Sequence, residues 1–323
     1  MSAPAAQATL SFVRNALRPV VWVANDNGSK VRRLAAGTEP QVSPDGRTIA
    51  FLRMGRGFRP DMMVAPADGS SPPRRLFAGW RVPFSFAWSP DSATIAAVRG
   101  PEIGRQRLVL IDVAGGAQRT VARGFVNGLS FSPDGTRLVY SLAAKDNFPP
   151  RSDLYVTGVG GGPRTRITRD HRSLSPLWGP DTIVFAKQLG AGQRRYGPKN
   201  ELFLIQPDGR GARRLTHTRV DPLLQGLTPT DWSADGSRLL AEFGGQDTSY
   251  AVALNPRTGA QRPLTRNFET GFTGAALSAD GQFILGATGG FEPGPGHNVV
   301  SVPYSGGRGR VLARNAFEPD WSR

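Results

Sequence analysis

The chain has 323 residues, no cysteine, and 40 Lys and Arg against 25 Asp and Glu, which gives a formal net charge of +15. The lack of cysteine excludes disulfide bridges, thiolate catalysis and cysteine-ligated metals. No run approaches the roughly 18 apolar residues of a membrane-spanning helix. The 40 Gly and 27 Pro among short apolar runs are typical of an all-β chain with many tight turns.

The first segment is rich in alanine, and Ala6-Gln7-Ala8 has the A-x-A pattern of a signal-peptide cleavage site. One interpretation is the remainder of a trimmed signal, which predicts a periplasmic or extracellular protein. The other is a disordered tail, which leaves a cytoplasmic location open. The sequence does not choose between them.

Three short apolar segments follow, at residues 8–12, 20–23 and 31–34. They match the second, third and fourth strands of a repeat that fills the rest of the chain. No first strand precedes them. The missing strand is therefore expected elsewhere in the sequence.

A Ser-x-Asp-Gly tetrapeptide recurs four times in full and twice in altered form, as Ser-Pro-Asp-Ser at residues 89–92 and Gly-Pro-Asp-Thr at residues 179–182, with spacings of 46, 43, 47, 54 and 45 residues between the six copies. A period near ~40–45 residues with four strands is typical of a β-propeller blade. Proline fixes the backbone angle φ at the second position of a turn, and glycine adopts the left-handed conformation in which the turn ends. The six copies begin at Ser43, Ser89, Ser132, Gly179, Ser233 and Ser278.

The same order of strands surrounds each copy. A short apolar strand A precedes the turn, strand B follows it with an aliphatic residue, and strand C is a second apolar run. Strand D, outermost, carries arginines, as in residues 74–76, 164–168, 213–216 and 262–265. Four antiparallel strands per repeat make one blade.

The segment Glu318-Pro319-Asp320-Trp321-Ser322 resembles strand A and lies 44 residues after Ser278, one further period. We therefore predict an all-β, seven-bladed β-propeller with four-stranded antiparallel blades and a single domain over residues 1–323. Blade seven would combine residues 8–35 with 315–323, so that one C-terminal strand joins three N-terminal strands. This pairing would cover the free sheet edges and hold both termini.

The repeat Trp-Ser-Pro-Asp-Gly, an aliphatic strand, Asp-Gly and Arg-Arg-Leu-Thr resembles the TolB-like β-propeller repeat family over nearly the whole chain. The resemblance implies a docking platform, as in TolB, or a gating domain, as in prolyl oligopeptidases. TolB resembles a six-bladed ring preceded by a small α/β domain, and neither feature fits here. Its lipoprotein partner is therefore not carried over. The peptidases' Gly-x-Ser-x-Gly pentapeptide does not occur in this chain.

Residues suited to catalysis or metal binding are few. The only histidines are His171, His217 and His297, whereas lyases that resemble this family use several histidines around a metal. The Asp residues of the repeated turns lack calcium-loop spacing and are interpreted as turn residues. We predict no catalytic residue, no metal site and no cofactor, although an enzyme that uses carboxylates stays open.

The positive charge has two parts. Arginines on strand D discourage pairing between exposed sheet edges and need no ligand. Others lie in the B–C and D–A connections, which emerge on one face of a propeller and are where binding residues are expected. The candidate binding residues are Arg59, Arg105, Lys145, Arg169, His171, Arg194, Arg195, Tyr196, Lys199, His217, Arg219 and Phe291.

The sequence therefore favours a non-catalytic, exported scaffold that binds a protein or an anionic envelope ligand through this loop face. The alternative is a hydrolase or lyase with carboxylates and arginines at the central channel. Nucleic acid is disfavoured, because no aromatic residues alternate with the basic ones to form a stacking platform. Convergent carboxylates in the structure would favour the enzyme.

Overall fold

The computed structural model describes residues 9–55, 59–78, 85–100, 106–143, 151–190, 199–218, 224–245, 249–264, 271–289 and 296–322. These residues form strands β1 to β28 and contain no helix, which confirms the all-β prediction. They belong to two compact units. Unit 1 comprises Met1–Trp80 with Leu264–Arg323, and unit 2 comprises Arg81–Pro263.

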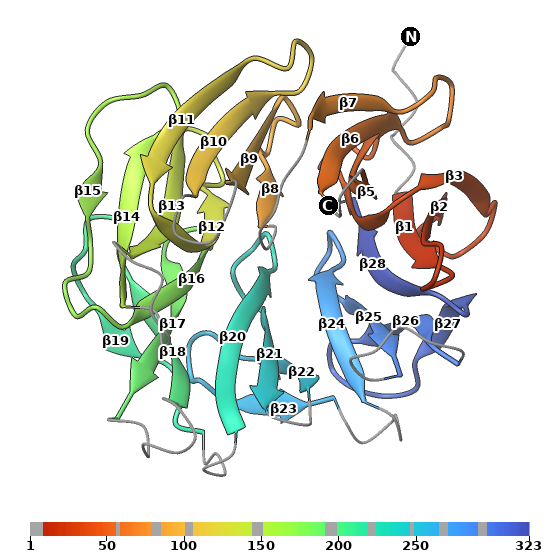
Figure 1. Cartoon of the computed structure of the whole chain (residues 1–323). Helices are drawn as coiled ribbons and strands as arrows, with labels where there is room; N and C mark the ends of the chain where they lie inside the picture. The colour runs from red at the N-terminus through yellow and green to blue at the C-terminus, as the bar shows by residue number, and fades with distance from the viewer. Residues whose placement is uncertain are drawn as a thin grey trace, which may run out of the picture. The chain divides into compact units, whose positions relative to one another are not determined.

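In unit 1 the strands pair antiparallel in groups of four (Figure 1). The first group contains β28 (Phe317–Trp321), β1 (Thr9–Arg14), β2 (Val20–Asn25) and β3 (Arg32–Ala36). The second contains β4 (Thr38–Val42), β5 (Thr48–Met54), β6 (Pro60–Pro66) and β7 (Arg74–Phe77). The third contains β24 (Phe272–Leu277), β25 (Phe283–Thr288), β26 (Asn298–Pro303) and β27 (Arg310–Arg314).

Unit 2 also contains antiparallel groups of four strands, and one parallel pair of residues, Asn200 and Gly226, joins its last two groups. Its first group contains β8 (Phe86–Trp88), β9 (Thr94–Arg99), β10 (Arg107–Asp112) and β11 (Gln118–Arg123). The second contains β12 (Phe125–Phe131), β13 (Arg137–Ala143), β14 (Ser152–Gly158) and β15 (Thr165–Arg166). The third contains β16 (Ser173–Trp178), β17 (Ile183–Leu189), β18 (Lys199–Ile205) and β19 (Arg213–Arg214). The fourth contains β20 (Leu224–Trp232), β21 (Leu239–Gly245), β22 (Ser249–Leu254) and β23 (Gln261–Pro263).

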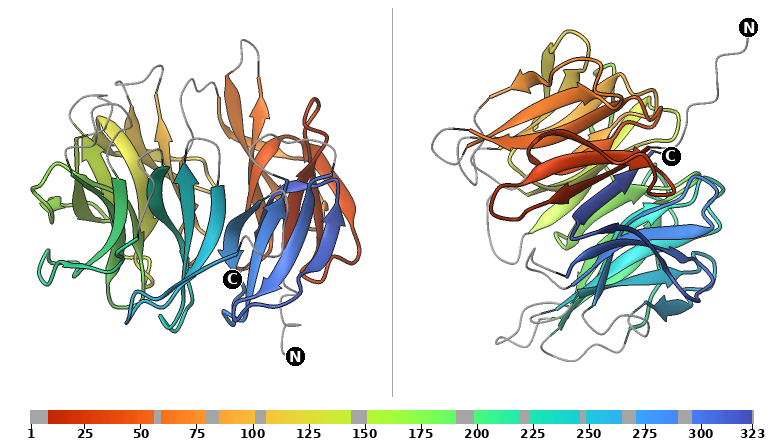
Figure 2. Two further views of the ribbon diagram at one scale, coloured as in Figure 1. Left: turned by 90° about the horizontal axis from the view of Figure 1, so that it is seen from below. Right: turned by 90° about the vertical axis from the view of Figure 1, so that its right-hand side faces the viewer.

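The C-terminal strand supplies the strand that the N-terminal segments lack. Leu10 pairs with Trp321 and Ser11 with Asp320, and Figure 2 shows β28 beside β1 and β2. The indole Nε1 of Trp321 donates a hydrogen bond of 2.9 Å to the carbonyl oxygen of Leu277 on β24. The predicted joining of the two chain ends is therefore present within unit 1.

The repeated turns form as their residues predict. Ser132 Oγ donates to Asp134 Oδ1 at 2.5 Å, and Asp134 Oδ1 also accepts the backbone N–H of Thr136 at 3.0 Å. Gly135 at the exit has φ 68°, which an L side chain rarely adopts. The same serine–aspartate bond occurs in the turns at Ser43, Ser89, Ser233 and Ser278. The interpretation of these aspartates as turn residues is confirmed.

Several innermost strands contain a bulge that the sequence analysis did not anticipate. Glu39, Ser175 and Glu318 have φ near +50° and lie at shifts in strand register. Glu39 and Ser175 lie four residues before the repeated turns that begin at Ser43 and Gly179. Each of the three residues precedes a proline. The proline ring clashes with a preceding residue in the right-handed helical conformation and so disfavours that conformation. The bulge bends the strand and redirects the side chain of the bulged residue.

Two outermost strands are shorter than predicted: β15 and β19 contain two residues each instead of residues 164–168 and 213–216. The ladder continues through a side chain, because Ile167 N donates to Leu154 O at 2.9 Å while Leu154 N donates to Thr168 Oγ1 at 2.9 Å. Thr216 does the same for Leu202. The threonine hydroxyl therefore replaces a backbone carbonyl at the sheet edge.

The core lies between neighbouring groups of strands. In unit 2 Leu174, Val184 and Leu204 of β16 to β18 pack against Leu227 and Phe243 of β20 and β21. The facing apolar sides of these two groups of strands are thus removed from water, because each covers the other.

Candidate functional site

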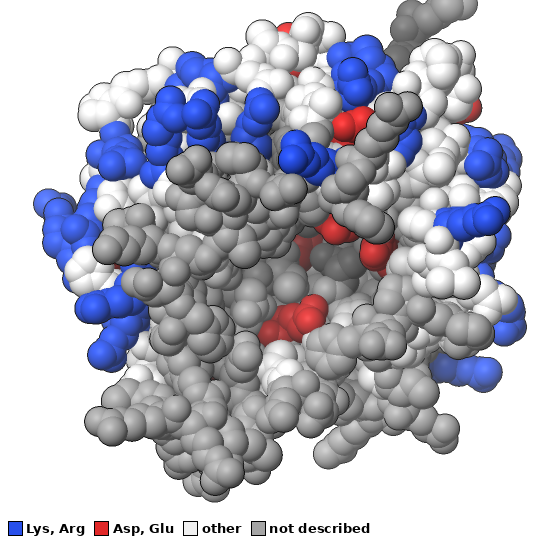
Figure 3. Space-filling view, viewed as in Figure 1, with Lys and Arg blue, Asp and Glu red and all other residues white. Residues whose placement is uncertain are grey.

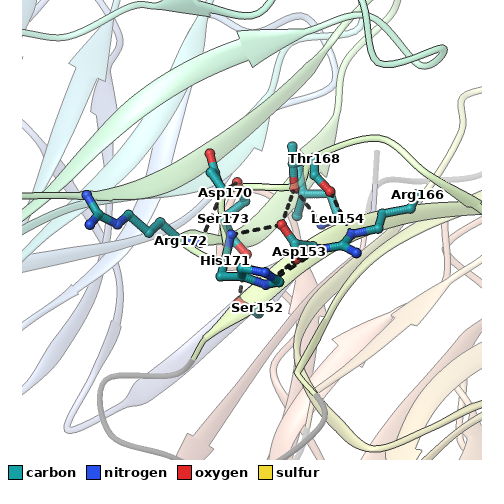
Figure 4. Close-up of polar contacts among 9 residues, drawn as sticks. All are labelled: Ser152, Asp153, Leu154, Arg166, Thr168, Asp170, His171, Arg172 and Ser173. Atoms are coloured by element: carbon teal, nitrogen blue, oxygen red, sulfur yellow. Dashed lines mark hydrogen bonds and ion pairs between the residues drawn. The ribbon is translucent and has the colours of Figure 1, made fainter.

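The candidate site lies along one edge of unit 2, where β14 and β18 begin and where β15 and β19 lead to β16 and β20. We call it the basic edge, and it consists of Arg166, Arg169, His171, Arg172, Lys187, Lys199 and Arg214. Three carboxylates lie among them: Asp153, Asp170 and Glu201. Figure 4 shows the part built around Asp153.

Asp153 is a buried carboxylate at the start of β14, with only 4% of its side chain exposed. Its Oδ2 lies 2.5 Å from Arg166 Nη2 and 2.8 Å from His171 Nδ1. Its Oδ1 accepts the backbone N–H of His171 at 3.0 Å and the hydroxyl of Thr168 at 3.3 Å. Both oxygens are therefore satisfied, as a buried carboxylate requires.

His171 turns back onto Asp153 because its backbone has φ 57°, a conformation that histidine tolerates better than most residues. Nδ1 lies 2.8 Å from Asp153 Oδ2, an acceptor, and 3.5 Å from Arg166 Nη2, a donor. The shorter contact, to the carboxylate, places a proton on Nδ1. Half of the side chain is exposed. The imidazole is thus held in one orientation at the surface.

Glu201 repeats this arrangement 48 residues later, at the start of β18. It is fully buried, and its Oε1 lies 2.9 Å from Lys199 Nζ and 3.2 Å from Arg214 Nη2. Thr216 donates its hydroxyl to Oε2. Arg214 Nε donates to Thr216 O at 2.7 Å, as Arg166 Nε does to Thr168 O at 3.0 Å. The same arrangement of a buried carboxylate, two basic side chains and a threonine hydroxyl therefore recurs in two successive repeats.

Asp170 and Lys187 connect the two carboxylate sites. Lys187 Nζ lies 2.7 Å from Asp170 Oδ2 and 5.0 Å from the ring centroid of Phe203, and Lys187 pairs in register with Glu201. Burial alone would raise the pKa of Asp170, but Lys187, the backbone N–H of Arg172 and the hydroxyl of Ser173 hold its pKa below the ordinary value. Asp170 therefore stays ionised at neutral pH.

The basic edge carries six Lys and Arg against three carboxylates. Arg169 and Arg172 are exposed, and they add charge that no carboxylate of the set neutralises. The other four cations contact a carboxylate and hold defined positions. Figure 3 shows Lys and Arg gathered over neighbouring parts of unit 2, around β11 and β15. The edge is therefore positively charged and largely preformed.

The structure places five of the predicted binding residues. Arg169, His171, His217 and Lys199 lie along this side of unit 2, and Arg59 lies in unit 1, exposed between β5 and β6. His171 and Lys199 contact the buried carboxylates, whereas His217 is exposed. The remaining predicted residues lie outside the described part of the chain: Arg105, Lys145, Arg194, Arg195, Tyr196, Arg219 and Phe291.

Four residues of this edge, Asp153, Glu201, Arg166 and Arg214, were not predicted from the sequence as site residues. The available signal was the repeated acidic–Leu–aromatic start of strand C together with an Arg-x-Thr or Arg-Leu-Thr end of strand D. Unit 1 has a looser version, in which Asp61 Oδ2 and Arg75 Nη1 are 3.6 Å apart. There Phe77 stands where the threonine would be, so the hydroxyl bond is missing.

Unit 1 contains a different feature, a pair of glutamates on two innermost strands. Glu318 Oε2 accepts the Glu39 backbone N–H at 2.6 Å and the Thr38 hydroxyl at 2.7 Å. Loss of water around the Glu39 carboxylate and the nearby negative charge of Glu318 raise the pKa of Glu39 to about 7. Glu39 as a whole is nevertheless exposed, so water still reaches it on one side while protein covers the other.

Other candidate centres are limited. Among the residues that the structure describes, no three His, Asp or Glu side chains gather in a way that could hold a metal ion. In unit 2, burial raises the pKa of Glu242, which the Ser249 hydroxyl contacts. Within the described ranges no helix is long and apolar enough to cross a membrane.

Comparison with solved structures identifies the fold as a β-propeller. The chain is similar to TolB from Acinetobacter baumannii, with a TM-score of 0.60 and 17% identity over 98% of this chain and 83% of that one. The fold is therefore that of a TolB-like β-propeller, which confirms the resemblance found in the repeats. No protein-family model and no curated protein sequence matches the chain.

Enzymes and parts of enzymes share this fold. An oligogalacturonate lyase in complex with manganese is similar with a TM-score of 0.62 and 18% identity over 95% of this chain and 85% of that one. The β-propeller domain of the Trilobed protease from Pyrococcus furiosus is similar with a TM-score of 0.67 and 14% identity over 96% and 93%. At these identities the likeness defines the fold and leaves the function open.

Proposed function

We propose that the chain forms one β-propeller domain of seven four-stranded blades, in which β28 with β1, β2 and β3 makes the seventh. Antiparallel strand pairing in groups of four, with three groups in unit 1 and four in unit 2, supports this count. The strand order that the groups share supports the assignment of each group as one blade. A crystal structure with another number of blades would overturn the count.

We further propose that this propeller is a non-catalytic binding protein whose basic edge takes an acidic segment of a partner protein. The observation that carries the proposal is the repeated pairing of a buried carboxylate with two basic side chains, Arg166 and His171 on Asp153, and Lys199 and Arg214 on Glu201. Side chains that are already ordered lose less entropy when a partner binds.

The charge and the position of the edge agree with this function. An excess of cations attracts an acidic partner from a distance and speeds encounter. The connections between rigid strands provide a stable support for contact residues. Arg169 and Arg172, which are exposed and have no carboxylate in the set, would make direct contacts. An anionic polymer of the cell envelope presents similar charge and is an outcome of the test below.

The test measures binding of a fluorescently labelled deca-glutamate peptide by anisotropy at low and physiological salt. The double variant Arg169→Gln/Arg172→Gln should bind about five-fold or more weakly. The control Arg210→Gln/Arg257→Gln removes equal charge from exposed turns at the opposite ends of β18 and β22 and should bind as the unmodified chain does. Equal losses in both variants, or no peptide binding, would overturn the assignment.

Pull-down from an envelope extract extends the test to natural partners. Retention of an acidic protein supports a protein partner, and retention of an anionic polymer instead would replace it. We also propose an exported location, on the A-x-A pattern of residues 6–8, which lie outside the described part of the chain. Cell fractionation that finds the protein only in the cytoplasm would contradict this location.

A second candidate function is an enzyme, and the Glu39–Glu318 pair favours it. A carboxyl group with a pKa of about 7 beside a second carboxyl group is an arrangement used for general acid and base catalysis. NMR titration of the Glu39 side-chain carbon tests this candidate. A transition near pH 7 that disappears in Glu39→Gln supports the pair, and a transition near 4.5 removes its basis.

A further inference from the structure

Arg14 in unit 1 is a cation held between two aromatic rings. It is the last residue of β1, and its guanidinium carbon lies 5.1 Å from the ring centroid of Phe12 and 5.0 Å from that of Trp22. Phe12 and Trp22 pair across β1 and β2 and pack with residues of β25, β26 and β27. Phe12 is fully buried. The rings therefore form a fixed wall for the guanidinium.

Arg14 has no acidic partner. Within the described part of the chain its side chain makes no hydrogen bond and no ion pair, and its Nε is buried without a partner. The indole Nε1 of Trp22 is a second buried donor without a partner. Buried donors of this kind are uncommon, and each costs free energy of about 1–3 kcal/mol. Two such donors therefore lie on a single pair of touching side chains.

Two partly covered arginines of unit 2 are neutralised. Arg166 and Arg214, each 33% exposed, bind the buried carboxylates Asp153 and Glu201. Arg14 is also partly buried, but it contacts only the faces of the Phe12 and Trp22 rings and no carboxylate. Arginine and indole N–H groups can donate and cannot accept. The group that would complete this site is consequently a negatively charged acceptor.

We propose that Arg14, clamped by Phe12 and Trp22, is a receptor for an oxyanion, either a carboxylate or a phosphate group. The terminal nitrogens of Arg14 lack protein partners and are not among the buried atoms, so they are the donors that the oxyanion reaches. Their planar fork matches two oxygens of one oxyanion. The site lies in unit 1, apart from the residues of the basic edge, and does not depend on the binding function proposed for them.

The test uses the full chain labelled with ¹⁵N and follows the indole N–H signals. The chain has six Trp, and the signal lost in Trp22→Phe identifies Trp22. Sodium phosphate and sodium acetate are added separately, with sodium chloride at equal ionic strength as the reference. A saturable shift of the Trp22 signal with either oxyanion, and not with chloride, supports the proposal. A response to phosphate alone identifies phosphate as the ligand group, and a response to both identifies a general oxyanion site.

Two variants locate the binding group. Arg14→Gln should weaken binding about ten-fold or more, because it removes the charged fork. Arg47→Gln removes the same charge from an exposed position in the turn between β4 and β5 and should bind as the unmodified chain does. Phosphate should also raise the melting temperature of the unmodified chain and Arg47→Gln, but not of Arg14→Gln. An unchanged Trp22 signal in the unmodified chain, or an equal shift in Arg14→Gln, would overturn the proposal.

Discussion

Replacement of Trp321 by alanine should destabilise unit 1 more than any exposed substitution. Trp321 is 6% exposed, packs in the cluster that contains Leu10, Phe12 and Leu285, and donates its indole N–H to Leu277. Loss of a buried Trp side chain costs about 3–5 kcal/mol, and loss of the hydrogen bond adds about 1 kcal/mol. The expected decrease in the free energy of unfolding is therefore about 4–6 kcal/mol.

This decrease is a large part of the stability of a typical domain, about 5–15 kcal/mol. Urea unfolding followed by circular dichroism measures it. Trp321→Phe keeps most of the ring but loses the indole N–H, so it should cost about 1–2 kcal/mol. Leu17→Ala is the control, because Leu17 is 95% exposed, and should change stability by less than about 0.5 kcal/mol.

Removal of residues 317–323 extends the same reasoning. It deletes β28, so β1 loses one of its two partner strands and β4 loses the carboxylates of Glu318 and Asp320 that accept its hydrogen bonds. Unit 1 should then fail to fold cooperatively. A cost below about 1 kcal/mol for Trp321→Ala, or an unchanged melting curve after the truncation, would refute the role of the C-terminal strand.

Three further substitutions test individual polar contacts. Asp153→Asn should destabilise the chain by about 2–3 kcal/mol in urea unfolding, because the partly exposed guanidinium of Arg166 then lacks its buried counter-ion. The control is Asp208→Asn, which removes the exposed ion pair of Asp208 with Arg210, 3.8 Å apart, and should have little effect. The hydroxyl of Ser132 and the N–H of Thr136 lower the pKa of Asp134 to about 2 from 3.8. Its contribution to stability is therefore present above about pH 4 and lost as the pH falls toward 2, and Asp134→Asn should remove this part of the acid dependence of melting. Glu39, whose folded pKa is raised to about 7 from 4.5, holds its proton in the folded state after the unfolded chain has released it, so stability falls between these pH values. Glu39→Gln should gain stability relative to the unmodified chain as the pH rises through that range, and parallel pH profiles for the two proteins would contradict the raised pKa.

The sequence predicted the turns because their interactions are local. Asp134 contacts Ser132 and Thr136, which are two residues away on either side, so the tetrapeptide contains nearly all the information for its own conformation. The alternation and spacing of apolar runs predicted the four strands of each repeat for the same reason. The length of β15 was wrong because a Thr168 hydroxyl, rather than a backbone carbonyl, completes its ladder.

The candidate site was predicted in part. His171 and Lys199 were selected for charge and loop position, and both contact buried carboxylates. Asp153 and Glu201 were not selected, because an acidic residue at the start of a strand looks the same in sequence whether it is exposed or buried. Their burial depends on the neighbouring strands and on the threonine that follows each outermost strand.

The sequence by itself determined the all-β class, the repeated turns and the pairing of the chain ends, since each follows from a period or a short motif. Only the tertiary structure decided which charged groups meet. Glu318 accepts a hydrogen bond from Glu39, 279 residues away, and Arg14 lies against Trp22 without a counter-ion. Electrostatic interactions depend on distance and on the water removed between groups, and neither quantity is encoded in the local order of residues.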